Sequence, residues 1–116
     1  MSEWNEWLNV PDFADALGVT ASDVREMIRL RQVIAVRRGP SDAWHLPAGF
    51  IEQREGGARV LATLPGTITM LSDAGLTDAE SAEWLLSHND ELGVEPLVAL
   101  REGRRAPVRR AAQTLF

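Results

Sequence analysis

The chain has 116 residues, no cysteine, and a formal net charge of −5 from 17 acidic residues against 12 arginines. The absence of cysteine excludes disulfides and thiolate metal sites. No stretch approaches the roughly 18 apolar residues of a membrane span, and the acidic N-terminus lacks the basic and apolar regions of a signal peptide. We therefore expect a cytoplasmic protein with one compact domain or two very small ones.

The segment that begins at Pro11 predicts a first helix. Proline suits a first helical turn, because its missing N–H group would have no partner there. Phe13, Ala14 and Leu17 then form one apolar face. Gly18 is placed to end the helix in the left-handed conformation.

Thr20 opens a second predicted helix, because it forms a capping box with Asp23 three residues later. Two helices joined by a short turn that contains glycine are typical of a helix-turn-helix. The inward-facing residues of the second helix are predicted to be Val24, Met27, Ile28 and Leu30.

A short hairpin is predicted after the second helix. Its strands are expected at residues 33–36 and 44–46, on either side of a turn at residues 39–42. A helix-turn-helix followed by such a hairpin is a winged helix, which places one helix in the major groove of DNA. Trp44, in the second strand, is expected to cover the small core beneath the hairpin.

The two halves of the chain are predicted to meet near Glu55. Residues 48–55 are expected to form a short helix or turn, with Phe50 and Ile51 packed under the wing. A Gly56-Gly57 pair follows and favours a break. The prediction is a winged helix-turn-helix domain at residues 1–55 and a helical C-terminal domain at residues 56–116 for dimerisation or partner binding. The expected fold class is mostly α with a small β-hairpin.

The second half is predicted to be helical throughout. Apolar residues recur at helical spacing over residues 60–71, although Pro65-Gly66 leaves open a division into two helices. Thr77 and Glu80 form a capping box that opens another helix. Two further helices are expected to begin at Pro96 and Pro107.

The basic residues concentrate on the second helix and the wing. Five arginines and one acid lie between Arg25 and Arg38, for a net charge of +4, so the remainder of the chain carries −9. In a winged helix, the second helix meets base edges, while arginines and hydroxyls hold phosphates. The alternative is a solvated helix face and a pair of arginines that only aid solubility. The candidate DNA-binding residues are Thr20, Ser22, Arg25, Arg29, Arg37 and Arg38.

The sequence contains no constellation typical of an enzyme. His45 and His88 are the only histidines, and neither has ligand spacing around it, so we expect no metal and no cofactor. No serine lies in a Gly-x-Ser-x-Gly elbow, and no Gly-rich loop has the pattern of a phosphate-binding motif. We therefore expect a protein that is not an enzyme.

A second basic cluster lies near the end of the chain. It also carries a net charge of +4, and two interpretations stay open: neutralisation of the domain's own acidic surface, or a second surface that contacts phosphate. Its members are Arg101, Arg104, Arg105, Arg109 and Arg110, with Glu102 as the one acid among them.

The order and identity of these residues carry a resemblance. The run from Val10 to Arg29, together with Ile34-Ala-Val-Arg-Arg, resembles the MerR/excisionase-type winged helix. With the later motifs, nearly the whole chain resembles the small actinobacterial winged-helix DNA-binding regulators typified by the mycobacterial PknL-substrate DNA-binding protein. These motifs are Leu64-Pro-Gly-Thr-Ile-Thr-Met-Leu, Gly75-Leu-Thr-Asp and Glu83-Trp-Leu.

The resemblance implies a transcriptional regulator that binds double-stranded DNA through the six candidate residues named above. It also implies a helical C-terminal domain. A homodimer, or a protein partner bound through the C-terminal helices, is compatible with this architecture. An architectural factor like the phage excisionases has the same fold, but is expected to bend DNA.

A different class of function follows from a second resemblance. The C-terminal half is similar to the toxin-binding domain of Xre/MbcA/ParS-type antitoxins. This similarity implies an interaction module that binds a toxin or other partner through its C-terminal helices. The residues that carry it are Trp84, Leu85, Asn89, Leu92, Gly93, Pro96, Leu97 and Gly103.

Overall fold

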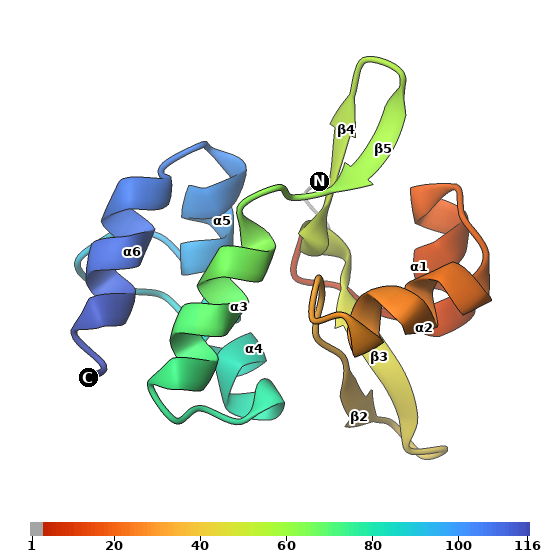
Figure 1. Ribbon diagram of the computed structural model, residues 1–116, viewed down its shortest axis with the longest axis horizontal. Coiled ribbons are helices and arrows are strands. Elements are labelled where there is room, and N and C mark those ends of the chain that lie inside the picture. Colours follow the sequence, from red (N-terminus) through yellow and green to blue (C-terminus); the bar gives the residue numbers. More distant parts are fainter. Residues whose placement is uncertain (1–3) are drawn as a thin grey trace.

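The computed structural model describes residues 4–116. Its first part is a helix pair flanked by short strands (Figure 1). The elements of this part are β1 (Trp7–Asn9), α1 (Val10–Leu17), α2 (Ala21–Arg29), β2 (Val36–Arg38), β3 (Ala43–Pro47) and the 3-10 turn η1 (Ala48–Phe50).

The first helix has the boundaries that its sequence predicts. Pro11 lies in the first turn, and the Asn9 side chain accepts a hydrogen bond from the backbone N–H of Asp12 at 2.8 Å. Gly18 ends the helix with a φ of 80°, a conformation that costs glycine little. The predicted helix-turn-helix arrangement of α1 and α2 is confirmed.

The predicted hairpin is present, but its first strand begins later than expected. β2 and β3 pair antiparallel, with Arg37 opposite Trp44, and β1 pairs with the other edge of β3. Strand pairing starts only at Val36, because Val33 and Ile34 turn inward and are fully buried in the core. The predicted strand at residues 33–36 is therefore wrong for all but its last residue.

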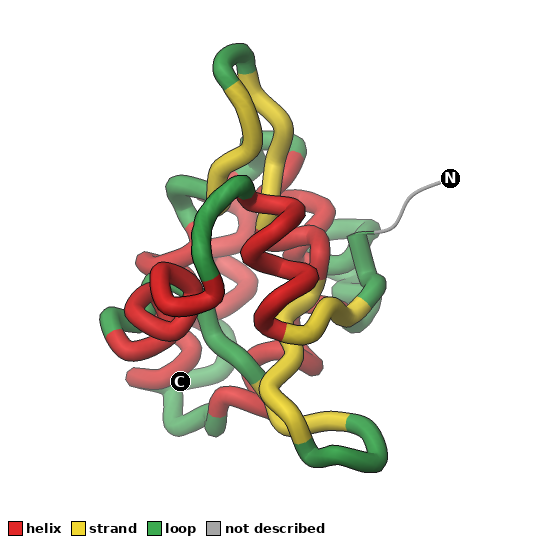
Figure 2. The backbone as a smooth tube through the Cα atoms, turned by 90° about the vertical axis from the view of Figure 1, so that its right-hand side faces the viewer, coloured by secondary structure: helices red, strands yellow, loops and turns green. Residues whose placement is uncertain are grey.

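A second hairpin lies where the sequence predicted a short helix or turn. Only η1 fits that expectation; β4 (Ile51–Arg54) and β5 (Gly57–Val60) then pair in antiparallel register. Gly56 and Gly57 both have positive φ, which allows the tight reversal. This hairpin and the β2–β3 hairpin project from opposite sides of the molecule (Figure 2). The expected domain division after residue 55 falls in this turn and stays a prediction.

Four helices make up the second part of the described chain: α3 (Leu64–Asp73), α4 (Asp78–Leu86), α5 (Pro96–Arg101) and α6 (Arg105–Gln113). α3 is undivided, since Pro65 lies in its first turn, where proline is tolerated. The predicted capping box of Thr77 and Glu80 opens α4. The last helix begins at Arg105, two residues before the expected Pro107.

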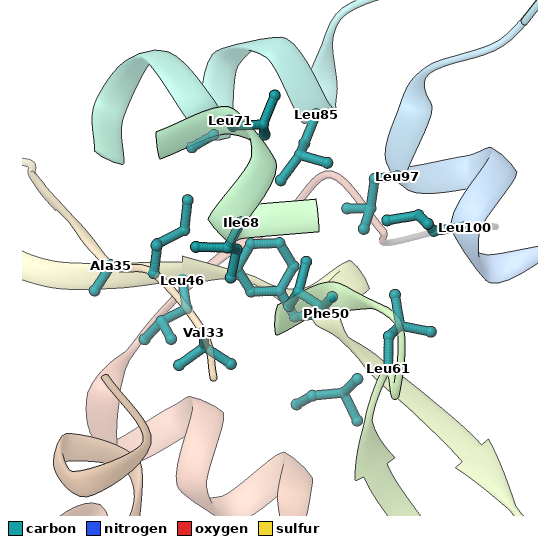
Figure 3. Close-up of a cluster of buried hydrophobic side chains, with 14 of the residues drawn as sticks. Val33, Ala35, Leu46, Phe50, Leu61, Ile68, Leu71, Leu85, Leu97 and Leu100 are labelled. Carbon is teal, nitrogen blue, oxygen red and sulfur yellow. The ribbon is translucent and has the colours of Figure 1, made fainter. Parts of the chain in front are cut away.

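One hydrophobic core joins the two parts. Phe50, from η1, is fully buried, and Figure 3 shows its ring beside Ile68 of α3, with Leu46 of the wing sheet on the same side of the ring as Ile68. Leu97 of α5 lies on the other side of the ring. Gly49 allows this close packing, because a Cβ atom there would lie 2.5 Å from the Trp4 carbonyl oxygen. The C-terminal helices are therefore held directly against the winged helix.

Candidate nucleic-acid interface

A capping box fixes the start of α2. The Thr20 hydroxyl accepts a hydrogen bond from the Asp23 N–H at 3.0 Å, and the Asp23 carboxylate accepts one from the Thr20 N–H at 3.1 Å. Val24, in the next turn, is fully buried. The capping box and the buried Val24 together fix the start of α2 against the core. The opposite face of the helix is exposed to solvent.

Three of the predicted residues share the exposed side of α2. Ser22, Arg25 and Arg29 follow one another at spacings of three and four residues, which places them along one helix face. All three are exposed. Within residues 4–116, Arg25 forms no ion pair or side-chain hydrogen bond, so its guanidinium is available to an anion.

Arg29 is oriented by Glu26, a residue that the sequence analysis did not single out. The Nε of Arg29 donates to one oxygen of the Glu26 carboxylate at 3.0 Å, and Nη2 donates to the other oxygen. These hydrogen bonds lower the pKa of Glu26 from its ordinary value and raise that of Arg29. Both side chains are largely exposed, so the pair contributes little to the free energy of unfolding. Its main effect is to fix the orientation of the Arg29 guanidinium group.

The end of the helix-turn-helix is tied to the C-terminal helices by an ion pair. Arg31 donates two hydrogen bonds to the carboxylate of Asp78, at 2.8 and 2.9 Å. Asp78 is the first residue of α4, so this contact joins the segment after α2 to the start of another helix. Sequence reasoning missed this pair because the two residues are 47 positions apart.

The two wing arginines lie on opposite faces of the sheet. Side chains alternate along a strand, and Arg37 and Arg38 are consecutive in β2. The Arg37 guanidinium lies 4.3 Å from the ring centre of Trp44, whereas that of Arg38 lies 4.2 Å from the ring centre of Trp7. The wing therefore presents one arginine on each face rather than a pair on one.

Arg38 faces α4. It lines a hollow of about 410 Å³ together with Trp7 from β1 and with Glu80 and Glu83 from α4. Two carboxylates thus border the space that Arg38 enters. Arg37 lies on the other face of the sheet, away from α4, and its own partners are the backbone oxygen and carboxylate of Asp42 in the turn.

Two apolar residues are more exposed than expected. Trp44 was predicted to cover the core, but it is 43% exposed and lies beneath the Arg37 guanidinium instead. Leu30 was predicted to face inward, but it is 50% exposed, because it follows the last helical residue of α2 as its C-cap. The core under the wing is filled by Leu46 and Phe50 instead.

The second hairpin also carries two arginines, but both are paired with the same carboxylate. Arg54 and Arg59 lie 3.3 and 3.4 Å from the carboxylate of Glu52, which is itself largely shielded from solvent. The signal that predicts this hairpin is the Gly56-Gly57 pair, which suits a tight turn, followed by the alternating Ala58-Arg59-Val60. Its charge pattern differs from that of α2, where Arg25 has no acidic partner among the residues described.

Neither histidine belongs to a wider polar cluster. His45 contacts the backbone oxygen of Ala43 at 2.8 Å, and His88 lies 3.4 Å from the carboxylate of Asp90. Across residues 4–116, no three potential metal ligands among His, Asp and Glu come together. No helix in the same range is long and apolar enough to cross a membrane.

Comparison with protein-family models divides the chain into two matching segments. Residues 1–51 match the model described as "DNA-binding protein Rv2175c, wHTH domain". Residues 61–115 match the model described as "Rv2175c C-terminal domain of unknown function". The first segment contains the helix-turn-helix and the wing, and the second contains α3 to α6.

Similar proteins include the DNA-binding protein Rv2175c of Mycobacterium tuberculosis (strain ATCC 25618 / H37Rv). The two are 31% identical over 103 residues, which is 89% of this chain and 64% of that protein, so the match leaves over a third of the relative unaligned. A solved NMR structure of Rv2175c superposes with a TM-score of 0.76 at 28% identity. That superposition covers all of this chain and 85% of the solved one.

Proposed function

We propose that the chain belongs to the Rv2175c-type family of winged helix-turn-helix DNA-binding proteins and that it is a transcriptional regulator of the MerR/excisionase type. In this proposal α2 enters the major groove and the β2–β3 wing contacts the phosphate backbone. The observation that carries the proposal is the exposed face of α2, where Arg25 has no partner among residues 4–116 and Arg29 is oriented by Glu26, beside a wing that carries Arg37.

The geometry of Arg29 suits the reading of guanine. Glu26 occupies Nε–H and one N–H of Nη2, which lie along one edge of the guanidinium group. The outer edge, formed by Nη1 and the second N–H of Nη2, stays available. Such an edge donates two parallel hydrogen bonds to O6 and N7 of guanine, the commonest specific contact in the major groove.

The remaining α2 residues suit phosphate contacts. Thr20 and Ser22 lie at the start of the helix, where backbone N–H groups and hydroxyls commonly hold a phosphate. Arg25 lies one turn before Arg29 on the same face and supplies a charge. On the wing, Arg37 is the main contact in this proposal, and Arg38 contributes less because it faces α4.

A titration by fluorescence anisotropy tests the proposal, with random genomic duplex and the gene's own upstream region as the two probes. A monomer with four to six phosphate contacts should give a log–log salt slope of about −4 to −5. We expect tighter binding to the upstream fragment, and Arg29→Ala should reduce that preference more than it reduces binding to random duplex. Absence of binding at low salt would contradict the proposal.

We also propose that the C-terminal helices support a homodimer or bind a protein partner. Leu115 and Phe116 follow α6 and are both exposed, which favours a contact there. A dimer would double the DNA footprint and require an operator with two-fold symmetry. Light scattering of the purified protein and identification of a co-purifying partner distinguish the two forms of this prediction.

A further inference from the structure

The second arginine cluster divides into two groups with different roles. Arg101 donates to the backbone oxygens of Gly49 and Ile51, at 2.8 and 2.6 Å, and so ties α5 to η1. Arg104 donates to the backbone oxygen of Leu92 at 3.2 Å and lies 3.5 Å from the carboxylate of Glu102. Both are used in holding the fold together.

The arginines of α6 are unpaired within the described chain. Arg105, Arg109 and Arg110 are exposed, and none has an ion pair or side-chain hydrogen bond with any residue between 4 and 116. Arg105 and Arg109 lie four positions apart, so they share a helix face and repel each other. No acidic residue follows Glu102 in the sequence, so nothing on α6 offsets this repulsion.

These two arginines border a hollow of about 420 Å³ between α3 and α6. Thr63, Gly66, Thr67 and Met70 of α3 and the preceding segment form the opposite wall. No acidic residue lines the hollow, although the protein as a whole is acidic. A hollow edged by two guanidinium groups that have no partner within residues 4–116 suits an anion that presents several oxygens, such as phosphate.

The hollow lies far from the helix-turn-helix. α6 and α2 are at opposite ends of the longest axis of the molecule (Figure 1), which extends over 36 Å. The two surfaces are therefore far enough apart for each to hold a DNA segment of its own.

We propose that the hollow edged by Arg105 and Arg109 binds the phosphate backbone of a second DNA duplex, so that one molecule joins two DNA segments. This inference rests on the proposed function, because α2 and the wing hold the first duplex. Two phosphates of one strand are close enough for guanidinium groups one helical turn apart to contact them together. The contact carries no sequence preference, since only phosphates are bound.

A capture experiment tests this inference. One short duplex is immobilised on beads and saturated with protein, and a second, fluorescently labelled duplex of random sequence is then added. Wild-type protein is expected to retain the labelled duplex. The double variant Arg105→Gln, Arg109→Gln should retain about tenfold less, while its affinity for a single duplex stays within about twofold of wild type.

The matched control is the double variant Arg54→Gln, Arg59→Gln. It removes the same charge from an exposed hairpin, where both arginines are paired with Glu52. Capture by this control should equal that of wild type, and the melting curves of both variants check that they fold. Equal capture by the α6 variant and wild type would overturn the inference, as would wild-type protein that binds the beads but captures nothing. Failure of wild-type protein to bind the first duplex would instead contradict the proposed function and remove the basis of the inference.

Discussion

Arg37 and Arg38 are neighbours in β2, yet their guanidinium groups cover two different tryptophans on opposite faces of the wing sheet. The two are therefore expected to contribute unequally to DNA binding. Arg37→Ala should reduce the steepness of the log–log salt slope by about 0.9, the value for one lost phosphate contact. Arg38→Ala should change it by less than half of that, because its side chain faces Glu80 and Glu83. Equal changes in the slope, measured by anisotropy, would contradict the assignment of faces.

The ion pair of Arg31 and Asp78 should couple the helix-turn-helix to α4. Both side chains are more than a third exposed, so the coupling free energy is expected to be below about 1 kcal/mol. A double-mutant cycle with Arg31→Ala and Asp78→Ala, measured by urea denaturation, gives this energy directly. Strictly additive effects of the two substitutions would show that the pair contributes nothing to stability.

The hydrogen bonds between Glu26 and Arg29 lower the pKa of the Glu26 carboxyl. Hydrogen bonds from Arg29 hold the pKa of the Glu26 carboxyl below its ordinary value of 4.5. Because the folded pKa is depressed, the pair is fully formed above pH 4.5 and is lost as the pH falls through the folded pKa. An NMR titration should place the Glu26 midpoint below 4.5, and Arg29→Ala should return it towards that value. A midpoint that Arg29→Ala leaves unchanged would mean that the pair does not form in solution.

The shared core predicts that the two parts of the chain unfold together. Phe50 is fully buried and contacts a cluster with members from both parts (Figure 3). Phe50→Ala should lower the free energy of unfolding by about 3 to 5 kcal/mol through lost burial and the cavity left behind. In wild-type protein, circular dichroism and tryptophan fluorescence should report one coincident transition. Two separated transitions would show that the halves are independent.

Local signals in the sequence predicted most of the secondary structure. The capping boxes that begin at Thr20 and Thr77 and the glycine after α1 have the predicted geometry, because each depends on residues within one turn of the chain. The β4–β5 hairpin was missed because Gly56-Gly57 was interpreted as a break between domains. Both interpretations use the same glycines, and only the pairing of the flanking strands distinguishes them.

Contacts between distant residues account for what the sequence could not show. The pair of Arg31 with Asp78, and that of Arg101 with the Gly49 carbonyl, join positions about 50 residues apart. Trp44 was expected in the core because tryptophan is large and apolar, but the space beneath the wing is taken by Leu46 and Phe50. The faces of Arg37 and Arg38 depend on which residues form the first strand of the wing. The predicted strand at residues 33–36 ended before both arginines, whereas β2 contains them.

We propose that α2 and the wing together form the DNA-binding surface. An NMR titration of isotope-labelled protein with a short duplex, followed through the backbone amide signals, distinguishes this surface from the C-terminal helices. The largest shifts are expected at residues 20–29 and around Arg37, with little change at Arg54 and Arg59 of the second hairpin. Shifts confined to α3–α6, with the α2 signals unmoved, would contradict it.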